Sequence, residues 1–295
     1  MAHLNDDRHS LRRRPAARNQ SVQTAGKMRV FVPGKELLIG LAIVGWIVLT
    51  LQFFELSLRG SVASYGFGMA LLDPLRSIYA QAEGWQTLIY SLCVTDSIYW
   101  NAVDFTKALT MWLSMVLAMM VPTLLPLFSN SVRAPLPFRQ TGTFVSGYLL
   151  AWTSFCLAAV AVQWSMRSSL LIDESFVSVT PVLNGLILIA AGLYQVSAQK
   201  RHHLKACRLS LKRHRRKQPD HALLKEGLSY GARCIGCCWP LMATMFVFGL
   251  MNIIAMAALT LVMVSEKIIS RSYTVLKLTS CLLIGTGVLA IISVV

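Results

Sequence analysis

The feature that most constrains this chain is a series of apolar runs, each about 20 residues long, separated by polar segments. A helix of roughly 20 apolar residues crosses the hydrocarbon core of a bilayer and satisfies its own backbone hydrogen bonds there. Seven runs of this kind are found, at about 36–54, 107–128, 142–164, 177–198, 226–250, 252–270 and 274–294. The sequence therefore predicts an all-α, polytopic transmembrane helix bundle of about seven spans.

Composition supports this class of protein. The chain is 55% hydrophobic and only 14% charged, whereas soluble domains carry about 25% charged residues. More than 30 polar and basic residues precede the first apolar run, so that run is not expected to be a cleaved signal peptide. We expect a basic, disordered cytoplasmic tail at 1–35 and a single transmembrane domain at 36–295.

The distribution of charge predicts the orientation. The net charge is +15, and eight of the 28 Lys and Arg residues lie in 1–35, with ten more in 199–225. Basic loops stay on the cytoplasmic side of a membrane. The N-terminus and a basic loop at 199–225 are therefore predicted to be cytoplasmic. The acidic segment 55–106 is predicted to lie at the outer interface, and the C-terminus outside.

The same basic segments predict some partners and exclude others. Basic residues beside a bilayer attract anionic lipids, so we expect anionic lipids at the basic loops. Nucleic acid is not an expected partner, because both basic clusters flank apolar spans and no nucleic-acid-binding module accompanies them.

Sulfur-containing side chains are concentrated in the fifth apolar run. Residues three or four apart share a face of a helix. By this spacing, one face of the run carries Cys234, Cys237, Cys238, Met242 and Met245. Thiolates and thioethers are soft ligands that select Cu(I), but cysteine and methionine also serve as ordinary packing residues. Pro240, within this stretch, is expected to free a backbone carbonyl.

Two further candidate ligands precede this run. His203 and Cys207 are four residues apart, so they face the same way if the fourth span continues as a helix. They would then lie near the cytoplasmic start of the fifth span. Histidine and thiolates together form known metal sites; the alternative for His203 is a solvated basic loop.

Other notable residues have structural explanations. Met111, Met115 and Met119 share a face of the second run, which is more typical of packing than of ligation. Glu266 and Lys267 fall near the inner end of the sixth run. They are expected to reach water there as a snorkelling pair.

The sequence lacks the usual catalytic patterns. It contains no phosphate-binding glycine loop, no nucleophile elbow and no paired carboxylates within the apolar runs. We therefore do not expect an enzyme. Thiol redox chemistry at Cys237 and Cys238 is a third alternative, which is disfavoured because adjacent cysteines form only a strained bridge.

Motifs over roughly 105–270 resemble a bacterial family known as predicted metal-binding integral membrane proteins, a membrane domain of unknown function with a Gly-Cys-Cys-Trp motif. The matching residues are Trp112, Met115, Met119, Met120, Pro122, Gly147, Tyr148, Trp152, Gln163, Gly192, Tyr194, Gln195, Lys200, Cys207, Arg208, Cys234, Gly236, Cys237, Cys238, Trp239, Met242, Asn252, Met256, Glu266 and Lys267. Several positions depart from the family pattern. His203 stands where the family usually has Cys, proline is expected near Ala198 and Ser210, and tryptophan is expected near Ala255.

The resemblance implies a multi-pass protein of the bacterial cytoplasmic (inner) membrane that binds a soft metal, with copper as the associated metal. The expected role is the handling of a soft metal, Cu(I) in particular, or its delivery to a membrane metalloenzyme. The candidate metal ligands are Cys234, Cys237, Cys238, Met242, Cys207 and His203. The alternative is a non-catalytic subunit or assembly factor of a membrane complex, with the sulfur atoms as packing.

Overall fold

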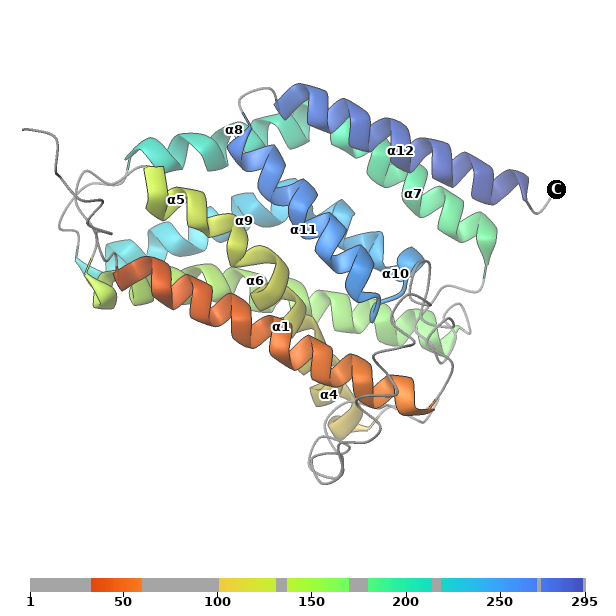
Figure 1. Cartoon of the computed structure of the whole chain (residues 1–295), viewed down its shortest axis with the longest axis horizontal. Coiled ribbons are helices and arrows are strands. Elements are labelled where there is room, and N and C mark those ends of the chain that lie inside the picture. The colour runs from red at the N-terminus through yellow and green to blue at the C-terminus, as the bar shows by residue number, and fades with distance from the viewer. Residues whose placement is uncertain are drawn as a thin grey trace, which may run out of the picture. The chain divides into compact units, whose positions relative to one another are not determined.

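The protein is described by a computed structural model that covers residues 33–59, 101–130, 137–169, 180–213, 219–269 and 272–293. Most of the predicted tail 1–35 and of the predicted interfacial segment 55–106 lies outside these ranges, as does part of the loop 199–225. Every regular element in the described ranges is helical (Figure 1). The elements are α1 (Pro33–Arg59), α4 (Ala102–Met115), η3 (Val116–Met120), η4 (Pro122–Leu124), α5 (Leu125–Asn130), α6 (Phe138–Ser168), α7 (Pro181–Val196), α8 (Ala198–Arg213), α9 (Asp220–Ala243), α10 (Met245–Phe248), α11 (Ile253–Ile268) and α12 (Ser272–Ile292).

Several of these helices are long and apolar enough to cross a membrane. Five continuous candidates are present: Gly34–Phe53, Ala102–Phe128, Phe138–Ser168, Asp220–Phe248 and Tyr273–Ile292. A sixth arises if α7 and the first part of α8, which meet at a 58° bend, count as one span. The all-α class is thus confirmed. Five or six helices are long and apolar enough to be spans, so the predicted number of seven is not established by length and composition. The difference arises at α7 and α11, which have only 16 residues each.

The break expected near residues 249–252 is present. Gly249 adopts a φ of 96°, a left-handed conformation that glycine reaches without steric cost. Asn252 then caps α11, its Oδ1 accepting a hydrogen bond from the Ala255 N–H at 2.9 Å. A glycine turn followed by an N-cap is why this long apolar stretch forms separate helices.

Close helix packing places α6 beside α9 along their length. Gly147 of α6 and Gly227 of α9 allow this approach, because a Cβ at either position would collide with the backbone of the opposite helix. Small residues at such contacts are typical of helices packed within membranes. This pairing fixes the position of α9, which carries the cysteines.

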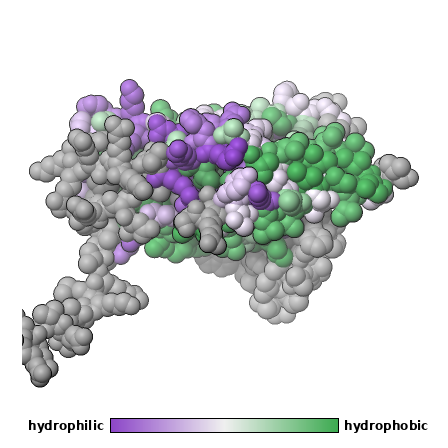
Figure 2. Space-filling view, turned by 90° about the horizontal axis from the view of Figure 1, so that it is seen from above, coloured by the Kyte–Doolittle hydropathy of each residue, from purple (hydrophilic) through white to green (hydrophobic). Residues whose placement is uncertain are grey.

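A second close pair joins α7 to α12 (Figure 1). Viewed from above, hydrophilic residues gather over the α8 end of this face, and hydrophobic residues gather over α7 and α12 (Figure 2). The bend between α7 and α8 therefore marks a change from apolar to strongly basic surface. This change agrees with the basic character predicted for 199–225.

Buried methionines form a large part of the core in the described residues. Met111, Met115 and Met119 are all buried against the same core cluster as the cysteines of α9. This burial agrees with the packing role expected from sequence, since flexible thioethers fill irregular gaps.

Candidate metal centre

Three cysteines of α9 meet at one buried point. Cys234, Cys237 and Cys238 are separated by three and four residues, and their Sγ atoms all lie within 4.8 Å of one another. All three side chains are buried, and the thiols are free. The Sγ atoms of Cys237 and Cys238 are 3.2 Å apart. The sulfur stripe expected from helical spacing therefore brings three soft donors together.

Pro240 shapes the helix beside these thiols. Proline has no N–H, so the carbonyl of Gly236, four residues earlier, has no helical donor. The hydroxyl of Tyr194 donates to this carbonyl at 2.6 Å. The ring of Tyr194 also contacts Trp239, which remains 45% exposed. The carbonyl expected to be freed by the proline is thus satisfied from α7.

A buried lysine lies against the thiols. The Nζ of Lys267, on α11, is 3.1 Å from the Sγ of Cys234 and 2.8 Å from the Oγ1 of Thr123. The ammonium is also 5.9 Å from the centre of the Tyr230 ring. The prediction that Lys267 reaches water is wrong, because the hydrogen-bond acceptors at this depth draw its side chain into the core. A buried ammonium needs such partners to offset its lost hydration.

Tyr148, on α6, is another neighbour of the Cys234 thiol. Its hydroxyl donates to the carbonyl of Met120 at 3.2 Å and lies 3.4 Å from the Sγ of Cys234. Met120 ends η3, a π-helical turn in which the N–H of Val121 bonds to the carbonyl of Val116 at 3.3 Å. Such turns occur frequently at functional sites. Four elements, α6, η4, α9 and α11, therefore contribute to the surroundings of Cys234.

A buried ion pair involves Glu266, the residue of α11 immediately before Lys267. The Nζ of Lys200 is 2.8 Å from Oε2 of Glu266, and both side chains are almost fully buried, at 0% and 2% exposed. Gln195 contacts both groups, accepting from Lys200 and donating to Glu266 Oε1 at 3.1 Å. The snorkelling prediction is therefore wrong for Glu266 too. This network ties the α7–α8 bend to α11.

Arg208 makes a further link between these helices. Its guanidinium donates to the backbone carbonyls of Glu266, at 2.8 Å, and of Ile269. Carbonyls at the end of a helix lack helical donors, so Arg208 caps the end of α11. The cap and the ion pair together hold α8 in place beside α9 and α11.

The remaining predicted ligands lie at different places around the thiols. Cys207 is buried on α8 in the same core cluster as Cys237, near enough to influence that thiol. Met242 is buried one helical turn beyond Cys238. His203 is half-buried, with its ring over Gly236, where a Cβ would lie 2.8 Å from Nδ1. His203 therefore lies beside the group formed by the three cysteine sulfurs, outside it.

The cysteine geometry fits a shared soft metal ion. A metal–thiolate bond is about 2.3 Å long, so two sulfurs on one ion are at most about 4.6 Å apart. The sulfurs lie within 4.8 Å of one another, with Cys237 and Cys238 at 3.2 Å, so small shifts of the side chains would place all three on one ion. Three buried thiols are also the donor type that Cu(I) prefers. The residues present therefore have the chemistry of a site for a soft metal ion.

Sequence reasoning missed Lys267, Lys200 and Tyr148 as parts of this site. A usable signal existed for the first, because Lys267 shares a face of α11 with Met256 and Met263, both buried. An ionisable residue on a buried face of an apolar helix is by default a candidate functional residue. Lys200 gave no comparable signal, since it lies in a segment rich in exposed basic residues.

Comparison with known proteins gives the family. Residues 109–290, from within α4 to near the end of α12, match the model of the PpoB2 family, described as copper chaperone. The match covers more than half of the chain, and the chain belongs to this family. Neither the comparison with curated proteins nor that with solved structures gives a match. The metal-related and copper-related part of the resemblance inferred from the sequence is thereby confirmed, under a different family description.

Proposed function

We propose that this protein is a multi-pass protein of the bacterial inner membrane that binds Cu(I) and delivers it to a membrane metalloenzyme. The observation that carries the proposal is the meeting of three buried thiols within 4.8 Å in a chain of a copper chaperone family. The apolar candidate spans support membrane insertion. The seven-span topology, N-terminus inside and C-terminus outside, remains our proposal because it places every basic loop on the cytoplasmic side.

Cys234, Cys237 and Cys238 are the core ligands in this proposal, with Met242 and Cys207 as the nearest additional soft donors. If all three core sulfurs are thiolates, they and one Cu(I) carry a net charge of −3 + 1 = −2. Lys267, 3.1 Å from Cys234, reduces this to −1. A buried site gains from such compensation, since uncompensated charge is costly in a low dielectric.

Cys207 supplies a route for the metal. It lies on α8, the basic helix that follows the 58° bend, and it is next to Cys237. In the proposed orientation α8 is at the cytoplasmic side, so Cu(I) passes from Cys207 to the core ligands by exchange of one thiolate for another. His203 is on α8, as Cys207 is, and its ring lies over Gly236 of α9, beside this route.

Metal analysis of the full-length protein tests the proposal. Protein purified in detergent and loaded with Cu(I) under reducing conditions should retain stoichiometric copper. The Cys237→Ser, Cys238→Ser double variant should lose at least about tenfold in affinity, because loss of supporting residues alone costs 10–100-fold at metal sites. Cys156→Ser is the matched control, since Cys156 is also buried but lies outside the cluster.

Two results would contradict the proposal. Wild-type protein that remains free of copper after loading would remove the metal-binding role. A double variant that keeps its copper, and still co-purifies with a larger membrane complex, would favour the alternative of a non-catalytic subunit with the sulfurs as packing.

A further inference from the structure

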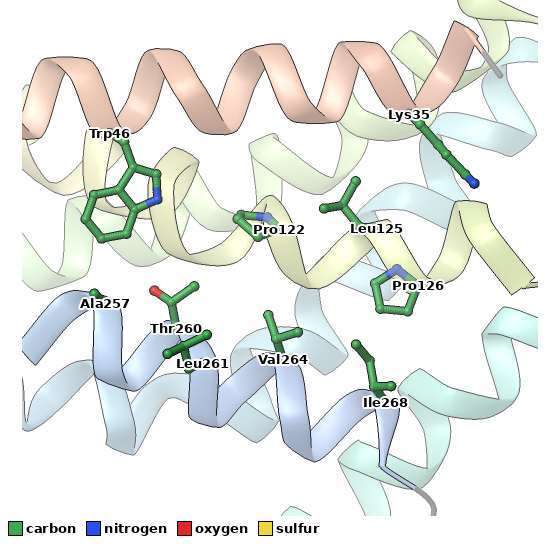
Figure 3. Close-up of a pocket in the computed structure, with 10 residues that line it drawn as sticks. All are labelled: Lys35, Trp46, Pro122, Leu125, Pro126, Ala257, Thr260, Leu261, Val264 and Ile268. Atoms are coloured by element: carbon green, nitrogen blue, oxygen red, sulfur yellow. The ribbon is translucent and has the colours of Figure 1, made fainter. Parts of the chain in front are cut away.

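A groove with a volume of about 700 Å³ lies between α1 and α11, with η4 and α5 as its floor (Figure 3). Lys35 and Ile268 stand at one end, and Trp46 and Ala257 at the other, so the two wall helices run antiparallel. The groove is open to the outside of the bundle, where Leu261 of its wall is 71% exposed. It is separate from the three thiols of α9.

The length of the groove matches one leaflet of a bilayer. From Lys35 to Trp46 is 46 − 35 = 11 residues, and from Ala257 to Ile268 is 268 − 257 = 11 residues. At about 1.5 Å per residue, both walls are about 17 Å long. Half of a hydrocarbon core of about 30 Å is about 15 Å. The groove therefore has the length of an acyl chain in one leaflet.

The chemistry of the lining is that of an amphiphile site. The walls and floor are apolar except at Lys35, Thr260 and the indole N–H of Trp46. The Thr260 hydroxyl already donates to the carbonyl of Met256 at 2.7 Å, so it is satisfied within its own helix. Lys35 is the one charged lining residue, and it forms no ion pair with any residue that the structure describes. One end thus attracts an anion, while the rest accepts hydrocarbon.

We propose that this groove binds one anionic phospholipid, with an acyl chain along α1 and α11 and the phosphate at Lys35. Lys35 lies at the end of the first span that the charge distribution assigns to the cytoplasm, where anionic lipids attract basic residues. A partner helix, about 10 Å across with its side chains, would be a wide occupant for a groove between two helices. An acyl chain is the slimmer occupant. The inference rests on the proposed membrane insertion but not on copper binding.

Lipid binding to the full-length protein in detergent tests this assignment. Native mass spectrometry after removal of bound lipid would compare titration with phosphatidylglycerol and with phosphatidylcholine. Wild-type protein should prefer phosphatidylglycerol by about fivefold, the effect expected of one lysine near an anionic lipid. Lys35→Gln should abolish this preference. Lys225→Gln, which removes an exposed lysine from α9, should keep it.

A second variant tests the apolar part of the groove. Ala257→Trp places a large side chain at the end opposite Lys35, and it should weaken binding of both lipids by a similar factor. Circular dichroism and size-exclusion chromatography would confirm that each variant is folded. Equal binding of the two lipids to wild-type protein, or equal behaviour of Lys35→Gln and Lys225→Gln, would overturn the proposal. Neither result depends on whether the thiols hold copper.

Discussion

Two buried lysines involve consecutive residues of α11 but have different partners. Lys200 of α8 contacts the carboxylate of Glu266 of α11 at 2.8 Å and is held by Gln195. Lys267, the next residue of α11, contacts the Cys234 thiol at 3.1 Å and the Thr123 hydroxyl at 2.8 Å. Among the described residues, only the first lysine has a permanent anion beside it.

The difference indicates that the pair of Lys200 and Glu266 has a structural role, whereas Lys267 supports the chemistry of the thiols. The pair of Lys200 and Glu266 balances its own charge, and so it can link α8 to α11 in every state of the protein. Lys267 has a full negative charge beside it only when a neighbouring cysteine, such as Cys234, is deprotonated to a thiolate. Its position is therefore explained by the ligand set of the metal centre more readily than by the needs of folding.

The largest expected effect comes from breaking the structural pair. Lys200→Met leaves the Glu266 carboxylate buried without its cation, and this should lower the free energy of unfolding by about 3–5 kcal/mol. The double variant Lys200→Met, Glu266→Met should recover most of this loss, because an apolar pair of similar size replaces the ions. Denaturant unfolding in detergent measures both, with the exposed Lys225→Met as control. A Lys200→Met protein as stable as the control would show that the pair is not structural.

Removal of the second lysine should affect copper instead. Lys267→Met should weaken Cu(I) affinity by about 10–100-fold, the usual cost of losing a residue that supports metal ligands. The free energy of unfolding of the copper-free protein should not fall, because no carboxylate is left unpaired. Competition with a Cu(I) chelator measures the affinity. If Lys267→Met destabilised the fold and left copper binding intact, the contrast between the two lysines would fail.

A smaller effect is expected from the α8 ligands. Cys207→Ser should weaken Cu(I) affinity by about tenfold, or about 1.4 kcal/mol, since Cys207 lies beside Cys237. His203→Ala should change affinity less than Cys207→Ser, because the imidazole lies over Gly236 outside the group of sulfurs. The same chelator competition ranks the two. The reverse ranking would return His203 to the core of the site.

The smallest expected effect concerns the proline-freed carbonyl. Tyr194→Phe removes the hydrogen bond to Gly236 and should cost about 1 kcal/mol of stability, with copper affinity changed only slightly. Thermal unfolding in detergent measures it. Tyr273→Phe is the control, because that exposed ring keeps its contacts with Arg201 and Lys277 when the hydroxyl is lost. Equal melting temperatures for the two variants would mean that the carbonyl is satisfied in another way.

Local rules predicted much of this protein. Helical spacing placed Cys234, Cys237 and Cys238 on one face, and the structure brings their sulfurs together. The break at Gly249 and the freed carbonyl before Pro240 followed from the properties of glycine and proline. These features depend on a few consecutive residues, so a sequence contains what is needed to infer them.

The surroundings of the thiols could not be predicted in the same way. Glu266 and Lys267 were expected to reach water, because long side chains near the end of a span usually do so. Their burial depends on Lys200, Thr123 and Cys234, which lie on three other elements. No spacing along the chain relates these positions.

An all-helical chain with apolar helices, a basic segment before the fifth apolar run and a helix face with three thiols could be inferred from the order of residues alone. Those properties follow from hydrophobicity, charge and the period of the helix, all of which act locally. The approach of a tyrosine from α6, a fourth thiol from α8 and a lysine from α11 to that face became evident only in the packed bundle. The physical reason is that buried polar groups choose their partners by proximity in space, which the packing of separate helices creates.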